Sequence, residues 1–230
     1  MQRSIKKVAV LGSGVMGSRI ACHFAGIGVE VLLLDMLAPG SNESTKAKER
    51  NQLVDSSLQA AIKSNPSPLY LQKFTQNIST GNFTDDIAKI SNADWIIEVV
   101  VERLDIKKII YDEVEKYRKP GTLVSSNTSG IPIHLMAEGR SDDFQKHFCG
   151  THFFNPPRYL RLLEIIPTAK TDPSIVDFHM HYGDVFLGKT TVLCKDTPAF
   201  IANRVGVFSM MSVLHIMEKM ELSIDEIESI

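Results

Sequence analysis

A glycine-rich hexapeptide near the start of the chain has the GxGxxG spacing of a dinucleotide-binding loop. Its residues are Gly12, Ser13, Gly14, Val15, Met16 and Gly17. In such a loop Gly12 permits a tight turn, Gly14 lets the backbone approach a pyrophosphate, and Gly17 lets a helix and a strand pack closely. The helix that follows would offer its N-terminal N–H groups and positive dipole end to the phosphates.

Asp35 stands at the end of the next apolar run, 18 residues after Gly17. A carboxylate at this position accepts hydrogen bonds from the ribose hydroxyls of adenosine. It would also repel a 2′-phosphate, so the predicted cofactor is NAD rather than NADP. The competing interpretation is a glycine turn with a purely structural role.

A polar tetrapeptide follows a later apolar run, and its residues are Ser126, Asn127, Thr128 and Ser129. Polar residues at the carboxyl ends of parallel strands face the ligand crevice of an α/β sheet. We therefore place Asn127 and Ser129 in that crevice. Alternatively, these hydroxyl groups only satisfy the local backbone of a turn.

His152 and Glu164 belong to two apolar runs joined by the turn Asn155-Pro156-Pro157-Arg158. An antiparallel pairing of these runs would place Glu164 beside His152. A carboxylate next to an imidazole fixes its tautomer and makes it a general base near pH 7. A histidine packed in the core, without catalytic function, is the other interpretation.

Asn203 lies at the start of a further helical segment that follows the last apolar run. Its amide is near the seam between two domains, from which it would reach the crevice. A capping or surface role is the alternative.

The elements that would position these residues alternate between short apolar and longer amphipathic runs. Strand, helix and strand within about 30 residues, at 7–11, 15–26 and 29–34, indicate a βαβ unit and a parallel sheet. Further strands are expected at 95–100, 123–126, 149–154, 162–166 and 190–194, with helices at 104–117 and 173–187. The predicted fold is α/β, a Rossmann-type doubly wound sheet that is mostly parallel with an antiparallel flank.

Residues 39–77 interrupt this order. We interpret them as an inserted pair of surface helices, the first spanning 43–63 with Leu53, Leu58 and Ile62 as its apolar anchors. Such a charged helix is either a solvated face or part of the wall that holds a large substrate.

The C-terminal segment reads as helical. Pro198 is expected to open a helix whose broad apolar face packs in a core. Ser223 and Glu226 have capping-box spacing, so a second helix should begin there. We expect residues 1–194 to form an NAD-binding domain and 195–230 to begin a helical domain that is truncated, which would reduce turnover.

Composition excludes several classes of protein. The 230 residues carry a net charge of −2, so no basic field recruits nucleic acid or membrane surfaces. No apolar run reaches the roughly 20 residues of a membrane span. The three cysteines form no CxxC pair, so no metal site is expected and reduced, cytoplasmic thiols are the default.

Taken together, these motifs resemble the L-3-hydroxyacyl-CoA dehydrogenase family. The stretches that carry the resemblance are LGSGVMG (11–17), SSNTS (125–129), HFFNP (152–156) with Glu164, and KDTPAFIANR (195–204). The resemblance covers nearly the whole chain except the 39–77 segment, and the four stretches follow the order found in the family. The resemblance implies NAD-dependent oxidation of L-3-hydroxyacyl-CoA to 3-oxoacyl-CoA in fatty-acid β-oxidation, with homodimerisation through the complete helical domain.

The resemblance also assigns roles to matching positions. His152 resembles the catalytic base and Glu164 its partner, while Ser129 and Asn203 resemble the residues that hold the substrate oxygen. Cofactor contacts are implied for Glu102, Lys107, Asn127 and Asn155, beside the loop residues and Asp35.

The chain departs from the family pattern in places. Ala199 stands where glycine is common, and this is tolerable if its φ is helical. Gly130 replaces a common serine, and Pro157-Arg158 alters the turn before Glu164. The long 39–77 segment resembles members fused to an enoyl-CoA hydratase unit. A dehydrogenase of a small 3-hydroxy acid without CoA, and a non-catalytic cofactor-binding relative, remain as alternatives.

Overall fold

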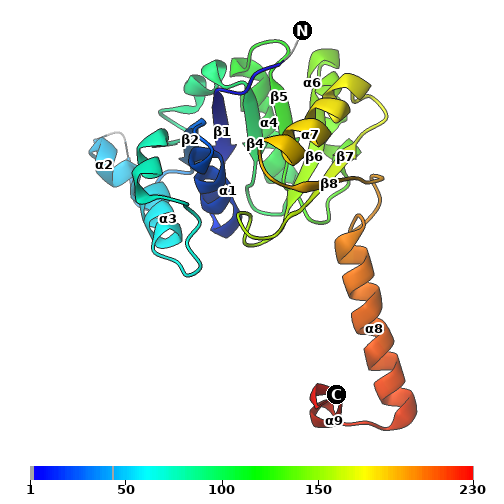
Figure 1. Cartoon of the computed structure of the whole chain (residues 1–230). Coiled ribbons are helices and arrows are strands. Elements are labelled where there is room, and N and C mark those ends of the chain that lie inside the picture. Colours follow the sequence, from blue (N-terminus) through cyan, green and yellow to red (C-terminus); the bar gives the residue numbers. More distant parts are fainter. Residues whose placement is uncertain (1–2, 43, 230) are drawn as a thin grey trace.

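The computed structural model describes residues 3–42 and 44–229. Among them, eight strands form one sheet in the order β3-β2-β1-β4-β5-β6-β7-β8 (Figure 1). In chain order they are β1 (Lys7–Leu11), β2 (Glu30–Asp35), β3 (Ile78–Asn82), β4 (Trp95–Glu98), β5 (Leu123–Ser126), β6 (Phe148–Phe153), β7 (Leu162–Pro167) and β8 (Thr190–Leu193). All neighbours are parallel except β6 and β7, which confirms the predicted mixed sheet.

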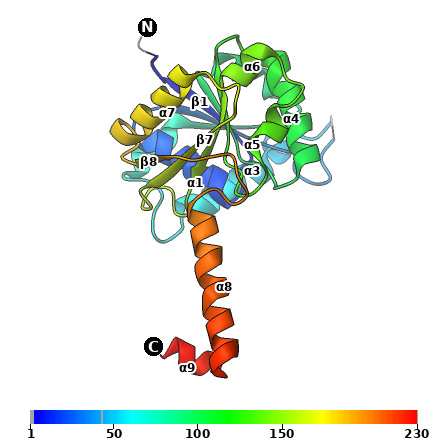
Figure 2. The same ribbon diagram turned by 90° about the vertical axis from the view of Figure 1, so that its right-hand side faces the viewer.

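Helices cover both faces of this sheet (Figure 2). The α-helices are α1 (Val15–Gly26), α2 (Ala47–Arg50), α3 (Gln52–Ile62), α4 (Leu104–Tyr117), α5 (Ile133–Ala137), α6 (Asp142–Lys146), α7 (Pro173–Val185), α8 (Ala202–Met220) and α9 (Ile224–Glu228). Two 3₁₀ segments, η1 (Gln72–Asn77) and η2 (Ile87–Asn92), flank β3 and precede β4.

The strands are buried on both sides, and their side chains alternate between two cores. In β1, Val8 and Val10 join the core under α1, α3 and α7, whereas Ala9 and Leu11 join the core under α4, α5 and α6. This alternation is the period of two that a strand imposes on its side chains. It explains why the strands read as continuous apolar runs in the sequence.

The order in which strands are added to the sheet reverses at β1. The chain first moves outward through β2 and β3, then returns to place β4 on the other side of β1. Ligands of open α/β sheets bind at the carboxyl ends of the strands where this reversal occurs. The loops after β1 and β4 therefore mark the crevice, and the glycine-rich hexapeptide is the loop after β1.

One expectation about the inserted segment is wrong, and another is confirmed only in part. The helix expected at 43–63 is instead two helices, α2 and α3, which meet at Asn51; Glu43 lies outside the described residues. Of the expected anchors, Leu58 is buried and Leu53 and Ile62 are only half-buried, whereas Val54 and Ala61 are buried. Through α3 the segment packs against α1, β2 and β3.

The strand β3 was not expected, because Ile78–Asn82 contains Ser, Thr, Gly and Asn and lacks an apolar pattern. It pairs with β2 over five positions and forms one edge of the sheet. This strand is defined by its backbone pairing with β2. A pattern of apolar side chains in the sequence does not reveal such pairing.

The helix expected to open at Pro198 begins at Ala202, and the four residues before it form a turn. Every residue of α8 is at least partly exposed, so the expected core packing is absent from the described residues. Figures 1 and 2 show α8 projecting away from the sheet with α9 at its far end. The capping box of Ser223 and Glu226 at the start of α9 is confirmed.

Within the described residues, none of the helices has both the length and the apolar character that a membrane span requires.

Two buried histidines make the fold sensitive to acid. His23 in α1 and His179 in α7 are 2% and 1% exposed, and each has one ring nitrogen without a partner among the described residues. Burial lowers the pKa of both imidazoles to about 4. Both are therefore neutral in the folded protein and charged in the unfolded chain between about pH 4 and 6.5, so lowering the pH across this range favours unfolding.

We expect the free energy of unfolding to fall by about 2 kcal/mol per buried histidine between pH 7 and pH 5. Urea titrations at the two pH values measure this loss. The variant His179→Phe, of similar shape, should remove about half of it, whereas the exposed His181→Phe should leave it unchanged. Equal losses in the two variants would contradict the assignment.

Candidate active site

The glycine-rich loop has the shape that a bound pyrophosphate requires. Gly12 has φ 108°, and a Cβ there would lie 2.6 Å from the carbonyl oxygen of Val99. A Cβ at Gly17 would lie 1.8 Å from the carbonyl oxygen of Gly12. By contrast, a Cβ at Gly14 would meet nothing within 4 Å, so this backbone faces open space at the start of α1. Two glycines thus allow close packing, and the third leaves room for a ligand.

A cavity of about 660 Å³ lies beside this loop. It brings together eight of the residues predicted from the sequence: Gly12, Gly14, Val15, Met16, Asp35, Glu102, Asn127 and Ser129. Its remaining walls are mostly apolar, and they come from the residues after β2, after β3 and after β4 and from α4. The residues present fit an elongated nucleotide cofactor with an apolar base and polar sugars.

The carboxylate of Asp35 lies at the end of β2, as predicted. Its Oδ2 accepts hydrogen bonds of 2.6 Å from the backbone N–H and the hydroxyl of Ser13, and its Oδ1 accepts from the N–H of Met36 at 2.7 Å. A carboxylate has about four acceptor positions. Asp35 is thus oriented by the glycine-rich loop and retains capacity for a ribose hydroxyl.

A buried carboxylate that sequence reasoning missed organises the centre of the site. Glu98, at the end of β4, is fully buried, and its Oε1 accepts from the ammonium of Lys107 and the N–H of Val100, both at 2.7 Å. Its Oε2 accepts from the hydroxyls of Tyr111 at 2.9 Å and Ser126 at 2.6 Å. The signal was available, since Glu98 is the single charged residue within an otherwise apolar strand.

Lys107 therefore lies outside the lining of the 660 Å³ cavity. Its ammonium is 1% exposed and contacts Glu98 directly, with Glu102 at 3.3 Å on its other side. The two residues that the family resemblance implied as a cofactor pair thus differ in position. Glu102 lines the cavity, whereas Lys107 lies outside the cavity lining and contacts the carboxylate of Glu102.

Glu102 links the loop after β4 to the loop after β5. Its Oε1 accepts from the hydroxyl of Thr128 and from the N–H groups of Ser129 at 2.9 Å and Gly130 at 3.0 Å. Burial raises the pKa of Glu102, but these hydrogen bonds and the charge of Lys107 outweigh burial and lower it overall. Glu102 is therefore an anion that orders the Ser129 backbone, and among the described residues the Ser129 hydroxyl has no protein partner.

His152 and Glu164 are paired as the antiparallel turn predicted. They are directly opposite each other on β6 and β7, and Nδ1 of His152 lies 2.8 Å from Oε2 of Glu164. His152 is 4% exposed and Glu164 is fully buried. A buried carboxylate at this distance orients the imidazole, fixes its proton on Nδ1 and leaves Nε2 as an acceptor.

The remaining predicted residues lie on segments that adjoin this pair in sequence or through a hydrogen bond. Asn203 is half-buried in the first turn of α8, directly after Ala202, whose N–H donates to Glu164 at 2.8 Å. Asn155 accepts from the guanidinium of Arg19 in α1 at 2.5 Å. Asn127 accepts from the N–H of Phe153 at 2.9 Å and so ties the loop after β5 to the His152 strand.

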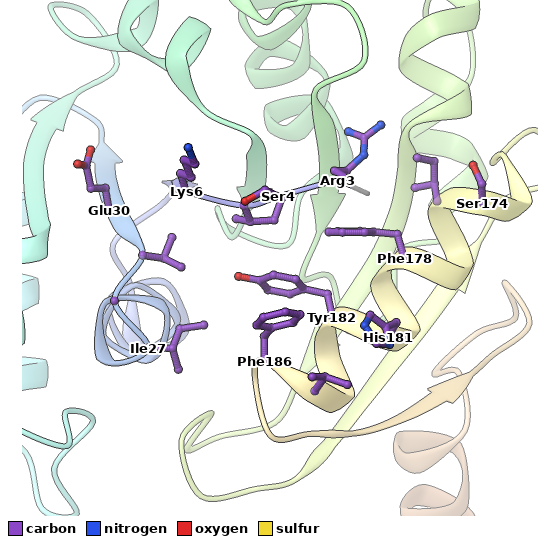
Figure 3. A pocket seen from close by; sticks show the side chains of 15 residues that line it. Arg3, Ser4, Lys6, Ile27, Glu30, Ser174, Phe178, His181, Tyr182 and Phe186 are labelled. Atoms are coloured by element: carbon purple, nitrogen blue, oxygen red, sulfur yellow. The ribbon is translucent and has the colours of Figure 1, made fainter. Parts of the chain in front are cut away.

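The inserted segment also approaches the site. Ser57, Ala60 and Ala61 of α3 share a cavity of about 350 Å³ with the glycine-rich loop and Arg19. A larger cavity, of about 970 Å³, lies at the opposite end of β1, between α7 and the turn before β2. Figure 3 shows its wall of Phe178 and Tyr182 from α7 and Phe186 directly after this helix. None of the predicted site residues lines it, so its size does not make it the active site.

Acidic, histidine and cysteine side chains form no metal-ligand cluster in the part of the chain that the structure describes. There, no three His, Cys, Asp or Glu side chains are grouped as metal ligands. The fold and the glycine-rich loop instead define a dinucleotide-binding domain of the Rossmann type, with a His–Glu pair at the same edge of the sheet.

Comparisons with known proteins identify this class further. The family model for the NAD-binding domain of 3-hydroxyacyl-CoA dehydrogenase matches residues 7–197. A probable 3-hydroxyacyl-CoA dehydrogenase of Bacillus subtilis (strain 168) is 50% identical over an alignment of 241 residues that covers 100% of this chain and 30% of the relative. A protein of the same description from Deinococcus radiodurans is 43% identical and is matched over 98% of this chain and 64% of its own length.

A solved structure agrees with these matches. The (S)-3-hydroxybutyryl-CoA dehydrogenase of Ralstonia eutropha superposes with a TM-score of 0.77 at 25% identity, over 97% of this chain and 75% of that one. The chain belongs to the 3-hydroxyacyl-CoA dehydrogenase family, as the resemblance in the sequence indicated, and its cofactor is NAD. It spans less than two thirds of the length of the Bacillus and Deinococcus relatives.

The Glu98–Lys107 pair gives a direct test of the site's framework. Replacing Lys107 by Met leaves a buried carboxylate without its counter-charge, so we expect a loss of about 3–5 kcal/mol in the free energy of unfolding. The matched control is Arg103→Met, which removes an ion pair to Asp105 that is mostly exposed on both sides and should leave the free energy of unfolding nearly unchanged. Urea denaturation measures both, and similar losses would refute a special role for the buried pair.

Proposed function

We propose that the protein oxidises L-3-hydroxyacyl-CoA to 3-oxoacyl-CoA in fatty-acid β-oxidation, with His152 as the general base. The observation that carries this proposal is the buried 2.8 Å contact between Nδ1 of His152 and Oε2 of Glu164. It leaves Nε2 as the nitrogen able to take a proton. None of the described residues hydrogen-bonds Nε2, so in this proposal Nε2 is the nitrogen that accepts from a substrate hydroxyl.

Each residue then has a part in the proton transfer. Nε2 of His152 takes the proton of the 3-hydroxyl group, and the carboxylate of Glu164 stabilises the imidazolium that forms. Ser129 and Asn203 donate hydrogen bonds to the substrate oxygen as it becomes a carbonyl oxygen. Bound NAD supplies the hydride acceptor. The reverse reduction uses the same groups in the opposite order.

The cofactor is held by the residues around the 660 Å³ cavity. In this proposal the N–H groups that follow Gly14 bind the pyrophosphate, and Asp35 accepts from the adenosine ribose. Glu102, Asn127 and Asn155 contact the nicotinamide half. Lys107 acts through Glu102 rather than by direct contact, because its ammonium is buried between Glu98 and Glu102.

The exposed apolar side chains of α8, among them Val205, Phe208 and Met211, would form a homodimer interface together with a complete helical domain.

The three cysteines are buried and unpaired, which suits a reducing compartment such as the cytoplasm.

The His152 assignment can be tested by replacing the residue. His152→Ala should lower the rate of acetoacetyl-CoA reduction, followed by NADH absorbance, by a factor of about 10²–10⁴. NADH affinity, measured by fluorescence, should stay within about twofold, because His152 lies outside the cofactor cavity. The control is His181→Ala, an exposed position on α7, which should keep the full rate. An unchanged rate in His152→Ala would remove His152 from the mechanism.

The substrate class needs a separate measurement. Isothermal titration of the NAD-loaded protein with acetoacetyl-CoA should show saturable binding, whereas free acetoacetate should bind at least about tenfold more weakly. The physical reason is that binding energy comes largely from the CoA portion, which is remote from the reacting carbon. Equal affinity for the free acid would favour a dehydrogenase of small 3-hydroxy acids. NAD binding without any turnover would favour a non-catalytic relative.

A further inference from the structure

The segment between β8 and α8 contains two consecutive residues in the left-handed conformation. Ala199 has φ 63° and Phe200 has φ 49°, so the helical φ on which tolerance of alanine at 199 depended is absent. Side chains with a Cβ rarely adopt positive φ, and a bulky aromatic residue does so only where its surroundings require it. The contacts of this turn therefore indicate its function.

The first contact is between the turn and the catalytic imidazole. Phe200 is 2% exposed, and its ring centroid lies 5.7 Å from that of His152 in an edge-on arrangement. Phe154 makes a second ring contact with His152, at 4.5 Å. One hydrogen bond at Nδ1 still allows the imidazole to tilt, whereas packed rings restrict the direction in which Nε2 points.

The second contact joins the turn to Glu164. While Oε2 of Glu164 holds His152, Oε1 accepts from the N–H groups of Ile201 at 3.1 Å and Ala202 at 2.8 Å. N–H groups at the start of a helix lack partners within the helix, and here a buried carboxylate satisfies two of them. Because the turn directs these groups inward, the imidazole and the start of α8 share one carboxylate.

We propose that the left-handed turn Ala199–Phe200 is the element that positions the His152 imidazole, with Phe200 as the positioning residue. Phe200 limits the tilt of the ring, and the two N–H groups that follow it hold Glu164 in the orientation that binds Nδ1. The inference rests on the proposed role of His152 as base. As a consequence, a change in the position of α8 relative to the sheet changes the direction in which Nε2 of His152 points.

The test compares Phe200→Ala with Phe200→Leu. The Nδ1–H proton of His152, hydrogen-bonded to a buried carboxylate, is followed by ¹⁵N-edited NMR, and kcat and KM are measured with acetoacetyl-CoA and NADH. Phe200→Ala should lose the Nδ1–H resonance and lower kcat by about 10- to 100-fold, with KM for NADH within about twofold. Phe200→Leu should recover the resonance and most of the rate. A Phe200→Ala protein with both unchanged would overturn the proposal.

A second pair of variants tests the turn without altering the ring. Glycine adopts positive φ freely and valine does not, so Ala199→Gly should keep kcat and the Nδ1–H resonance, and Ala199→Val should lose both. Equal behaviour of Gly and Val would overturn the proposal even if Phe200→Ala fails to fold. If the unaltered protein shows the Nδ1–H resonance but turns over no hydroxyacyl-CoA, the proposed function fails while the NMR comparison still decides the positioning role.

Discussion

A fully buried carboxylate at the end of β4 is the constraint on which the cofactor side of the structure depends. Glu98 lies away from water, where an unpaired charge would be prohibitively unstable. Lys107 neutralises it, and hydroxyls from α4 and β5 complete its hydrogen bonds. These bonds join the two strands and the helix that surround the crevice. The residue after Glu98, Val99, is also the one whose carbonyl leaves no room for a side chain at position 12. The polar centre and the glycine-rich loop are thus parts of one packing arrangement.

A second buried carboxylate organises the other side of the site. Glu164 contacts the imidazole with one oxygen and the start of α8 with the other. The two carboxylates have different surroundings and different tasks. Glu98 is matched by a buried ammonium and holds the framework, while Glu164 faces an imidazole, which can become charged. In the proposed mechanism a proton moves only at the second arrangement, because an imidazole has a second nitrogen that can accept a proton, whereas an ammonium has no acceptor.

Much of the site was predictable because its signals are local. The glycine spacing, the acidic residue after β2 and the polar residues after β5 each follow an apolar run that reads as a strand, and strands place such residues at one edge. Glu164 opposite His152 also followed from one short turn. The burial of Lys107 against Glu98 was not foreseen, since Glu98 belongs to another element. The break at Asn51, the strand β3 and the exposure of α8 depend on tertiary pairing that no local pattern encodes.

The amino-acid sequence by itself predicted the fold class, the cofactor and the pairing of His152 with Glu164. These rest on periodicity and short spacings, which are properties of neighbouring residues. Only the tertiary structure decided that Glu98 anchors the centre, that Lys107 stands behind Glu102, and that a left-handed turn at Ala199 and Phe200 sets the ring against His152. The physical reason is that buried charges and left-handed backbone are stabilised by groups distant in sequence, so their partners become visible only when the chain is folded.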